Sequence, residues 1–427
     1  MLSIIRADGT AEQQALAQLR SRSGEVDREV TAVVTKIVAD VRQDKDEALK
    51  RYAQKFDGAA PQKLEVSREE IQKALLTADD DFVRALRRAK ENIAAFHERQ
   101  KQQSFLDAQP NGVILGQRVR GLHRVGLYVP GGTAAYPSSV LMNAVPAKIA
   151  GVGELIMVTP PGKNGEANPD ILAAAAIAGV DRVFLTGGAQ AIAALAYGTE
   201  SIPKVDKIVG PGNIYVATAK KLLYGQVDID MIAGPSEILV VADETADPSY
   251  LAADLMSQAE HDRLASAILL CADEDVARRT IEEIERQAQS LSRRDIILES
   301  LENFGAVIVC RDFEQMVSLA NEIAPEHLEV MTQKPLESVG RFDNAGSVFL
   351  GRFSPEPLGD YFAGPNHVLP TSGTARFFSP LSVDSFVKRS SFIYYTEDAL
   401  RDAAKDIVTI AEKEGLTAHA NAITVRF

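Results

Sequence analysis

The sequence contains no tryptophan and only two cysteines among its 427 residues. Cys271 and Cys310 each end an apolar run, "ASAILLC" and "GAVIVC", of the kind found in buried strands. Two thiols are too few for a zinc site built from thiolates, and their scarcity is consistent with a reducing compartment. Any metal bound by this chain must therefore use imidazole, carboxylate or amide ligands.

The sequence also lacks a long apolar segment and a block of basic residues. No apolar run approaches the roughly 20 residues of a membrane-spanning helix, and the start "MLSIIRADGT" has no basic segment leading into an apolar run. The formal net charge of -13 is spread along the chain and would repel phosphate backbones and anionic lipid. We expect no nucleic-acid partner, no membrane partner and a cytoplasmic location.

What is present is the composition of a globular protein: 46% hydrophobic and 25% charged residues. The length is enough for two or more domains of roughly 100 to 200 residues. The first 105 residues read as helices, and "SREE" from Ser67 is a capping-box start. Apolar residues of the first long helix recur at near-helical spacing, at Val30, Val34, Ile37, Val41, Ala48, Leu49 and Tyr52.

From about Arg124 the pattern changes to short apolar strands that alternate with Ala/Leu-rich helices. The units begin "RVGLYVPGG", "ELIMVTPPG", "DRVFLTGGAQ" and "KIVGPGN", which predicts a parallel sheet covered on both faces. After Gly234 the strands "SEILVVAD", "ASAILLCAD", "GAVIVC" and "EVMT" alternate with helices over 248–258 and 275–289. We therefore expect a second α/β domain, and a last helix over 398–414.

Three glycine turns, "VPGGTAAYPSS", "TGGAQAIAAL" and "VGPGNIYVATA", each follow a strand and open a helix. The first amides of such a helix can hold a phosphate. None of the three matches G-x-G-x-x-G, the fingerprint that supports a dinucleotide site. On these residues alone a phosphate site and a plain tight turn both stay open.

Candidate chemistry comes first from two Glu/Gln-His combinations at element ends. In "LMSQAEHDR", Gln258 and His261 lie one turn apart on one helix face. They could be two ligands of one metal ion, or only a polar helix end. In "APEHLEV", Glu326 and His327 stand at a turn and point in different directions, which favours separate tasks, with His327 the natural general base. A surface ion-pairing turn is the alternative.

A third candidate lies in the long loop "PLGDYFAGPNHVLP", where glycines and prolines fix the backbone around Asp360 and His367. An Asx turn is the alternative for Asp360. Ligands of open parallel sheets normally bind beyond the carboxyl ends of strands, whereas the pairs at 258–261 and 326–327 precede strands. Either these turns face a cleft between domains or the expected boundaries are shifted. His97 lies in a surface-like helix and is given no role.

Taken together, eight motifs resemble the histidinol dehydrogenase family, in the right order and over nearly the whole chain. They are "RVGLYVPGGTAAYPSSVLMNAVPA", "GGAQAIAALAYGT", "VGPGNIYVATAKK", "AGPSEILV", "SQAEHD", "PEHLE", "GDYFAGPNHVLPT" and "EGLTAHANAITVR". The resemblance implies two similar three-layer α/β/α domains with parallel sheets, like those of aldehyde dehydrogenases, plus helical N-terminal and C-terminal arms.

The resemblance also suggests a division of the chain. Residues 1–25 would form the N-terminal helical arm. Residues 26–125 with 236–380 would form a first domain that carries the metal and catalytic residues. Residues 126–235 would form a second, NAD-binding domain, and residues 381–427 a helical C-terminal tail.

The activity implied is the four-electron oxidation of L-histidinol to L-histidine through L-histidinaldehyde, the last steps of histidine biosynthesis, with one Zn²⁺ per site and two NAD consumed. His327 resembles the general base, and Glu326 the residue that activates water. The resemblance further assigns zinc to Gln258, His261, Asp360 and His419, NAD to Tyr128, Gln190 and Asn213, and substrate to Ser236, Gln258, His261, His327, Asp360, His367, Glu414 and His419.

The resemblance implies a homodimer in which Glu414 and His419 complete the site of the partner subunit. Two other classes of function use overlapping residues. A zinc hydrolase would use Glu326 to activate water without a nucleotide, and a metal-dependent imidazole-binding protein would bind histidinol without converting it.

Overall fold

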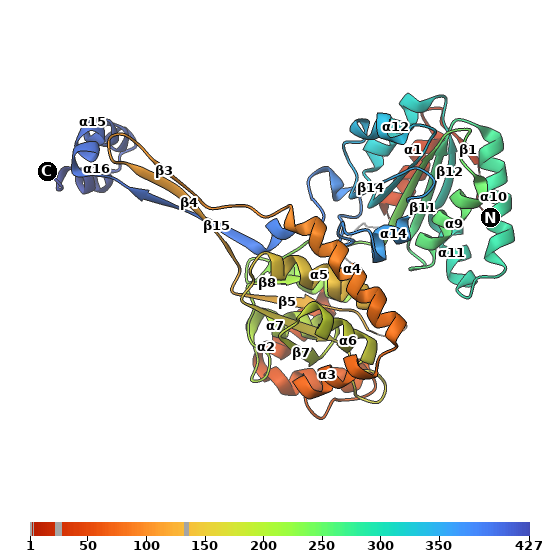
Figure 1. Ribbon diagram of the computed structural model, residues 1–427, viewed down its shortest axis with the longest axis horizontal. Coiled ribbons are helices and arrows are strands. Elements are labelled where there is room, and N and C mark those ends of the chain that lie inside the picture. The colour runs from red at the N-terminus through yellow and green to blue at the C-terminus, as the bar shows by residue number, and fades with distance from the viewer. Residues whose placement is uncertain (1, 3, 22–27, 132–135) are drawn as a thin grey trace.

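The strands of the computed structural model form two six-stranded sheets and one three-stranded sheet (Figure 1). The structure describes residue 2 and residues 4–21, 28–131 and 136–427. Each six-stranded sheet is the centre of one α/β domain, and we name the domains after their central strands, the β5 domain and the β10 domain. The predicted fold class, two α/β domains with parallel sheets, is confirmed.

The sheet of the β5 domain has the order β2-β7-β6-β5-β8-β9, in which only the edge strand β2 runs antiparallel. Its short apolar strands are buried because helices cover both faces. The strands are β2 (Glu65–Val66), β5 (Arg124–Tyr128), β6 (Glu154–Thr159), β7 (Arg182–Leu185), β8 (Lys207–Val209) and β9 (Asp228–Ile229).

The described residues of this domain form seven helices around the sheet: α2 (Arg28–Phe56), α3 (Arg68–Thr77), α4 (Asp80–Glu98), α5 (Pro137–Ile149), α6 (Pro169–Ala178), α7 (Gly188–Tyr197) and α8 (Ile214–Leu223). Helix α2 packs on α7 and α8, whereas α3 packs on α6 and α4 on α5. The predicted apolar face of α2 is buried apart from the half-buried Val30, and Ser67 caps α3 with Glu70 in a capping box.

These contacts correct the expected division of the chain, which grouped residues 26–125 with residues 236–380. Helices α2, α3 and α4 pack instead on the helices that cover the sheet of the β5 domain. The apolar spacing of a helix tells which face is buried, but it does not tell which sheet buries it.

The sheet of the β10 domain has the order β1-β12-β11-β10-β13-β14 and is parallel throughout. Its strands are β1 (Ile4–Arg6), β10 (Glu237–Ala242), β11 (Ser266–Cys271), β12 (Gly305–Val309), β13 (His327–Met331) and β14 (Ser347–Leu350). Its helices are α1 (Ala11–Ser21), α9 (Pro248–Ala259), α10 (Glu274–Ala288), α11 (Arg294–Phe304), α12 (Phe313–Ile323), α13 (Pro335–Ser338) and α14 (Glu356–Tyr361), with short 3-10 turns η1 (Val339–Arg341) and η2 (Thr374–Arg376).

The N-terminus is part of this domain, which corrects the expected helical arm over residues 1–25. Strand β1 pairs in parallel with β12, and Leu16 of α1 is buried in the core beneath α12. Residues 1, 3 and 22–25 of the expected arm lie outside the described residues. Cys271 and Cys310 are both buried, as predicted from their apolar runs.

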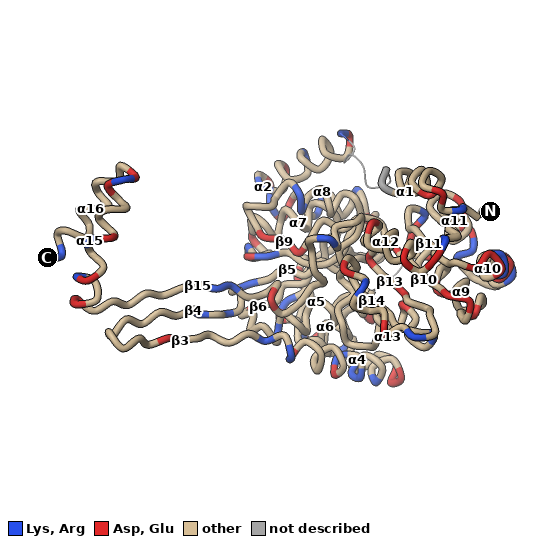
Figure 2. The backbone as a smooth tube through the Cα atoms, turned by 90° about the horizontal axis from the view of Figure 1, so that it is seen from above, with Lys and Arg blue, Asp and Glu red and all other residues tan. Residues whose placement is uncertain are grey.

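A long antiparallel stalk projects from the β5 domain and carries the C-terminal helices at its far end (Figures 1 and 2). It consists of β3 (Phe105–Ala108), β4 (Ile114–Gly121) and β15 (Val387–Tyr394), followed by α15 (Glu397–Lys413) and α16 (Thr417–Thr424). The turn η3 (Val383–Phe386) anchors its base, because Phe386 is buried in the core of the β5 domain.

The stalk corrects the expectation of a purely helical tail over residues 381–427, although α15 matches the helix expected over 398–414. Most of its side chains are exposed on both faces, so its strands lack the alternation that predicts a half-buried strand. Among the described residues, no helix is both long and apolar enough to span a bilayer.

Candidate metal centre and active site

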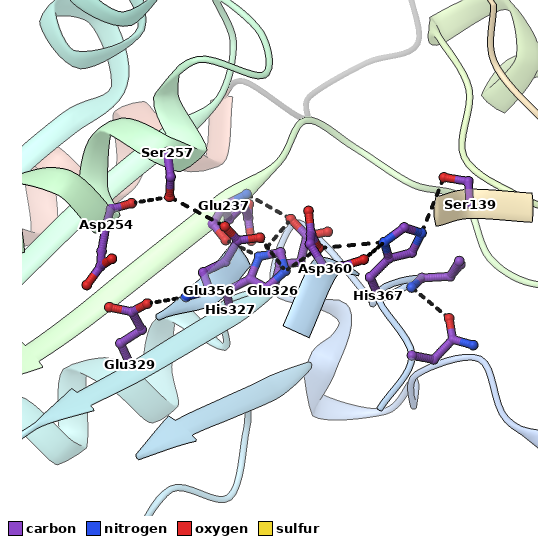
Figure 3. A network of polar contacts seen from close by, with 12 residues as sticks. Ser139, Glu237, Asp254, Ser257, Glu326, His327, Glu329, Glu356, Asp360 and His367 are labelled. Carbon is purple, nitrogen blue, oxygen red and sulfur yellow. Dashed lines mark hydrogen bonds and ion pairs between the residues drawn. The ribbon is translucent and has the colours of Figure 1, made fainter. Parts of the chain in front are cut away.

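The candidate site lies at the amino ends of β10 and β13 (Figure 3). His327 is the first residue of β13, and Glu326 directly precedes it, beside the start of β10 at Glu237. The site faces the other domain, since Oγ of Ser139 in α5 lies 3.3 Å from Nε2 of His367. This arrangement matches the inter-domain alternative from the sequence and departs from the usual position beyond the carboxyl ends of strands.

His327 is buried and held in one tautomer. Its Nδ1–H donates to the carbonyl oxygen of Glu237 at 3.0 Å, and because a carbonyl can only accept, Nε2 is left without a proton. Burial lowers the pKa of His327, against the opposing effect of Asp360. A neutral imidazole with a free Nε2 is the form that a general base requires.

Glu326 is also buried, which excludes a surface ion-pairing turn for this pair. Its Oε2 accepts from the backbone N–H of Glu237 at 2.8 Å and lies 3.6 Å from Nδ1 of His327. Burial raises the pKa of this carboxyl well above its ordinary value, although the backbone hydrogen bond acts in the opposite direction. A carboxylate with a raised pKa is a stronger base towards water when it is ionised.

Helix α14 brings two more carboxyl groups to the free nitrogen of His327. Oε1 of Glu356 lies 3.7 Å and Oδ1 of Asp360 lies 4.0 Å from Nε2. His327, Glu356 and Asp360 each offer one ligand atom, all within 4.8 Å of one another. Burial and the nearby Asp360 raise the pKa of Glu356 to about 9, so its carboxyl is protonated near neutral pH.

Three of the four predicted zinc ligands come from elements around this cluster. Gln258, at the end of α9, is buried, and its Oε1 has no hydrogen-bond partner among the described residues, which suits an amide oxygen that is a metal ligand. The end of α9 lies against α14, because Oγ of Ser257 donates to Oε2 of Glu356 at 3.4 Å. His261 is close enough that its charge lowers the pKa of His327. Asp360 lies on α14 itself.

The fourth predicted ligand, His419, is not near the site of its own chain. It is exposed on α16 at the far end of the stalk, and Glu414, at the end of α15, is exposed there too. Within one chain, both residues therefore lie away from the candidate site.

The two remaining predicted substrate contacts border the cluster. The Nδ1–H of His367 donates to the backbone oxygen of Asp360 at 3.0 Å, so its Nε2 accepts from Ser139, and burial lowers the pKa of His367. Ser236 lies directly before β10 and accepts through its backbone oxygen from Ser266 at 2.9 Å.

Several polar residues of the site were not among the predictions, namely Ser139, Glu237, Asp254, Glu329 and Glu356. One of them left a signal in the sequence: Glu329 is a single acidic residue inside the apolar strand "HLEVM". A charged residue in a buried strand needs a partner. The other four lie at element ends, or in helices where polar residues are common.

The three predicted NAD contacts lie in the β5 domain at the carboxyl ends of its strands. The hydroxyl oxygen of Tyr128 accepts from Gly188 N at 3.1 Å, and burial raises the pKa of Tyr128 to about 12. Gln190 of α7 is buried, and in the part of the chain that the structure describes its Oε1 has no hydrogen-bond partner. Asn213 caps α8 by accepting from Tyr215 N at 3.1 Å.

The strand order of the sheet supports a ligand site at the carboxyl ends of its strands. The chain leaves β5 for β6 on one side, and β8 lies on the other side, which makes the carboxyl ends of β5 and β8 a topological switch point. Residues 132–135 of the first predicted glycine turn lie outside the described residues.

Comparison with known proteins adds to this geometry. Residues 20–427 match the family model described as histidinol dehydrogenase. The chain belongs to the histidinol dehydrogenase family. It is 57% identical over 430 residues to histidinol dehydrogenase from Clostridium acetobutylicum, with 100% of each chain covered. It is also 57% identical over 409 residues to the Bacillus cereus enzyme, covering 96% of this chain and 95% of the relative.

A crystal structure of histidinol dehydrogenase from Elizabethkingia anophelis has the same fold. The TM-score is 0.92 at 38% identity, covering 100% of this chain and 97% of that one. Membership of the histidinol dehydrogenase family makes the chain an oxidoreductase, so the hydrolase and the non-enzymatic binding protein are set aside.

Proposed function

We propose that this chain oxidises L-histidinol to L-histidine through L-histidinaldehyde, consuming two NAD and using one Zn²⁺ per site, as the last steps of histidine biosynthesis. The observation that carries the proposal is the buried, neutral His327, whose free Nε2 faces the carboxyl groups of α14. Family membership names the substrate, and the switch point between β5 and β8 supports a position for the dinucleotide.

For the metal we propose Gln258, His261 and Asp360 from one chain and His419 from the partner subunit. Imidazole, amide and carboxylate are suitable zinc ligands, and the orphaned Oε1 of Gln258 fits this role. Asp360 is the carboxylate of the motif "GDYFAGPNHVLPT", and its Oδ1 lies 4.0 Å from Nε2 of His327. When bound, zinc would coordinate the imidazole and amine of the substrate and polarise the hydroxyl oxygen of the substrate.

The protein residues would then divide the two oxidation steps between them. Nε2 of His327 takes the hydroxyl proton while the carbinol carbon loses a hydride to the first NAD, which leaves the aldehyde. Glu326 takes a proton from water as the water adds to the aldehyde carbon, and the carbonyl oxygen gains the proton that His327 took in the first step, so that the neutral hydrate forms. His327, once deprotonated again, takes a hydroxyl proton from the hydrate while the second NAD accepts the second hydride.

We further propose a homodimer in which each stalk completes the site of the other subunit, through Glu414 and His419. A two-fold axis would exchange the two stalks and make both sites equivalent. Large apolar side chains are exposed on the stalk and on the helices at its end. They support this assembly, because a monomer rarely exposes much apolar surface in one region. They include Phe105, Leu106, Ile393, Ile410 and Val425. The two free, buried cysteines are consistent with a cytoplasmic enzyme.

The test is to incubate the zinc-loaded protein with L-histidinol and NAD and to follow the absorbance of reduced nicotinamide. We expect two reduced nicotinamides for each histidinol consumed, loss of activity after metal chelation, and recovery when zinc is added back. Zinc-loaded, folded dimer that binds histidinol but reduces no NAD would refute the proposal.

A further inference from the structure

Behind His327 lies a buried acidic pair, Glu329 and Asp254, that the mechanism above does not use. Glu329 is 0% exposed and Asp254 is 7% exposed. Glu329 lies two residues after His327 on β13, so both side chains leave the same face of the strand. Figure 3 shows the carboxyl groups of Glu329 and Asp254 close together, next to the start of α14.

Glu329 supplies an acceptor that the first turn of α14 lacks. Pro355, at the N-cap, offers no side-chain cap, and Pro357 has no N–H to donate. The N–H of Leu358 donates to the backbone oxygen of Pro355 at 3.0 Å. The N–H of Glu356 instead donates to Oε1 of Glu329 at 2.7 Å, in a buried hydrogen bond.

This hydrogen bond connects the strand that carries the base to the helix that carries the carboxyl groups facing it. Helix α14 has only six residues, so fixing its first residue fixes both Glu356 and Asp360. Their oxygens lie 3.7 Å and 4.0 Å from Nε2 of His327. The helix also packs closely against β14, where a Cβ on Gly359 would lie 2.6 Å from the ring of Phe349.

We propose that Glu329 is a positioning residue of the active site, whose hydrogen bond to the Glu356 amide holds α14 so that Glu356 and Asp360 face Nε2 of His327. It touches neither substrate nor cofactor and acts through α14. The inference rests on the proposed function, because turnover of histidinol is its main readout.

Asp254 explains why the second oxygen of Glu329 can be buried. Neither Oε2 of Glu329 nor Oδ2 of Asp254 has a hydrogen-bond donor among the described residues. Two ionised carboxylates can only accept, so a proton held between them satisfies both. Asp254 lies one turn before Gln258 on α9, and the pair therefore also ties the helix of a proposed zinc ligand to β13.

A glutamine at position 329 can reproduce both contacts. Its carbonyl oxygen can accept from the Glu356 amide, and its amino group can donate to Asp254. Glu329→Leu has a similar volume and can make neither contact. Thr280→Val is the matched control for removing a buried polar group, because the Thr280 hydroxyl is buried and donates within its own helix, at 2.8 Å to the backbone oxygen of Val276.

The experiment compares kcat, the KM for NAD, the zinc content and amide hydrogen exchange over residues 356–361 in these variants and the wild-type dimer. We expect Glu329→Leu to lower kcat by about tenfold to a hundredfold and to speed exchange at α14. The KM for NAD should be unchanged, because the proposed dinucleotide site belongs to the other domain. Glu329→Gln and Thr280→Val should stay within about threefold of wild-type kcat.

A kcat for Glu329→Leu within twofold of wild type, or a loss in Glu329→Gln as large as that in Glu329→Leu, would overturn the inference. If Glu329→Leu does not fold, Glu329→Asn replaces it, since its shorter amide cannot reach Glu356 and the same losses are expected. An inactive wild-type enzyme would refute the proposed function itself. An active wild type with unaffected variants would refute only the role of Glu329.

Discussion

The buried ion pair between Lys220 of α8 and Asp230 tests how the β5 domain holds a glycine turn. Their side chains are 3% and 1% exposed. Oδ2 of Asp230 accepts from Gly210 N at 2.7 Å, and Nζ of Lys220 donates to the oxygen of Gly210 at 3.1 Å. The pair therefore holds both backbone polar groups of Gly210, which begins the turn leading to Asn213 at the proposed NAD site.

Removing one charge of this pair should lower the free energy of unfolding much more than removing both charges. Lys220→Met leaves a buried carboxylate without a cation, and Asp230→Asn leaves a buried ammonium without an anion. Each single change should lower the free energy of unfolding by about 3 to 5 kcal/mol. The double variant buries no unpaired charge and should lose about 1 to 3 kcal/mol, the cost of the missing hydrogen bonds. The coupling energy should thus be at least about 3 kcal/mol.

The assay is urea unfolding followed by circular dichroism, since the chain has no tryptophan to serve as a fluorescence probe. Steady-state kinetics on the same variants should show a raised KM for NAD in both single variants and an unchanged KM for histidinol. Additive losses in the double variant would refute the reasoning about buried charge. A KM for NAD equal to that of wild type would refute the link between the pair and the turn.

Three further predictions concern the base, the water-activating residue and a destabilising carboxylate. His327→Asn should keep zinc and histidinol binding, measured by metal analysis and calorimetry, and lose turnover; loss of zinc would argue that His327 is a ligand. Glu326→Gln should slow the oxidation of supplied histidinaldehyde more than that of histidinol, and equal slowing would contradict its role with water. Burial raises the pKa of Asp57 from 3.8 to about 6. The folded state therefore binds the carboxyl proton of Asp57 more tightly than the unfolded chain does. As a result, the free energy of unfolding falls as the pH rises from about 4 to about 6. Asp57→Asn should stabilise the fold by about 1 kcal/mol near pH 8, after allowance for solvent screening, and by nothing below about pH 3.5; a gain that does not change with pH would contradict this cause.

Local patterns predicted the elements of this fold better than their assembly. The strands from β5 to β8 and from β10 to β13 follow from apolar runs that end in turns, and α2 follows from its helical spacing. His97 was expected at the surface but is buried, and its Nδ1–H donates to the oxygen of Ile93 at 2.8 Å. Its spacing from Leu86, Ala89 and Ile93, all buried on α4, carried the signal.

The same distinction applies to the site. Residues that lie close together in the sequence could be predicted as pairs, whereas contacts that only folding creates could not. Gln258 with His261, and Glu326 with His327, are visible as pairs because each pair lies within one turn. The buried contacts of Glu329 with Glu356 and of Ser139 with His367 join segments far apart in the sequence. No local pattern specifies such contacts, and the stalk that carries His419 away from its own site has no alternation to reveal it.

The most direct test of the shared zinc site is subunit complementation between His261→Asn and His419→Asn. Each variant homodimer should be inactive, because every site would lack one zinc ligand. In a heterodimer, one site would combine two altered residues and the other would be intact. Unfolding and refolding an equal mixture should therefore restore about one quarter of wild-type activity per protein. Activity that stays at the level of the separate variants, with heterodimers present, would contradict a site completed by the partner subunit.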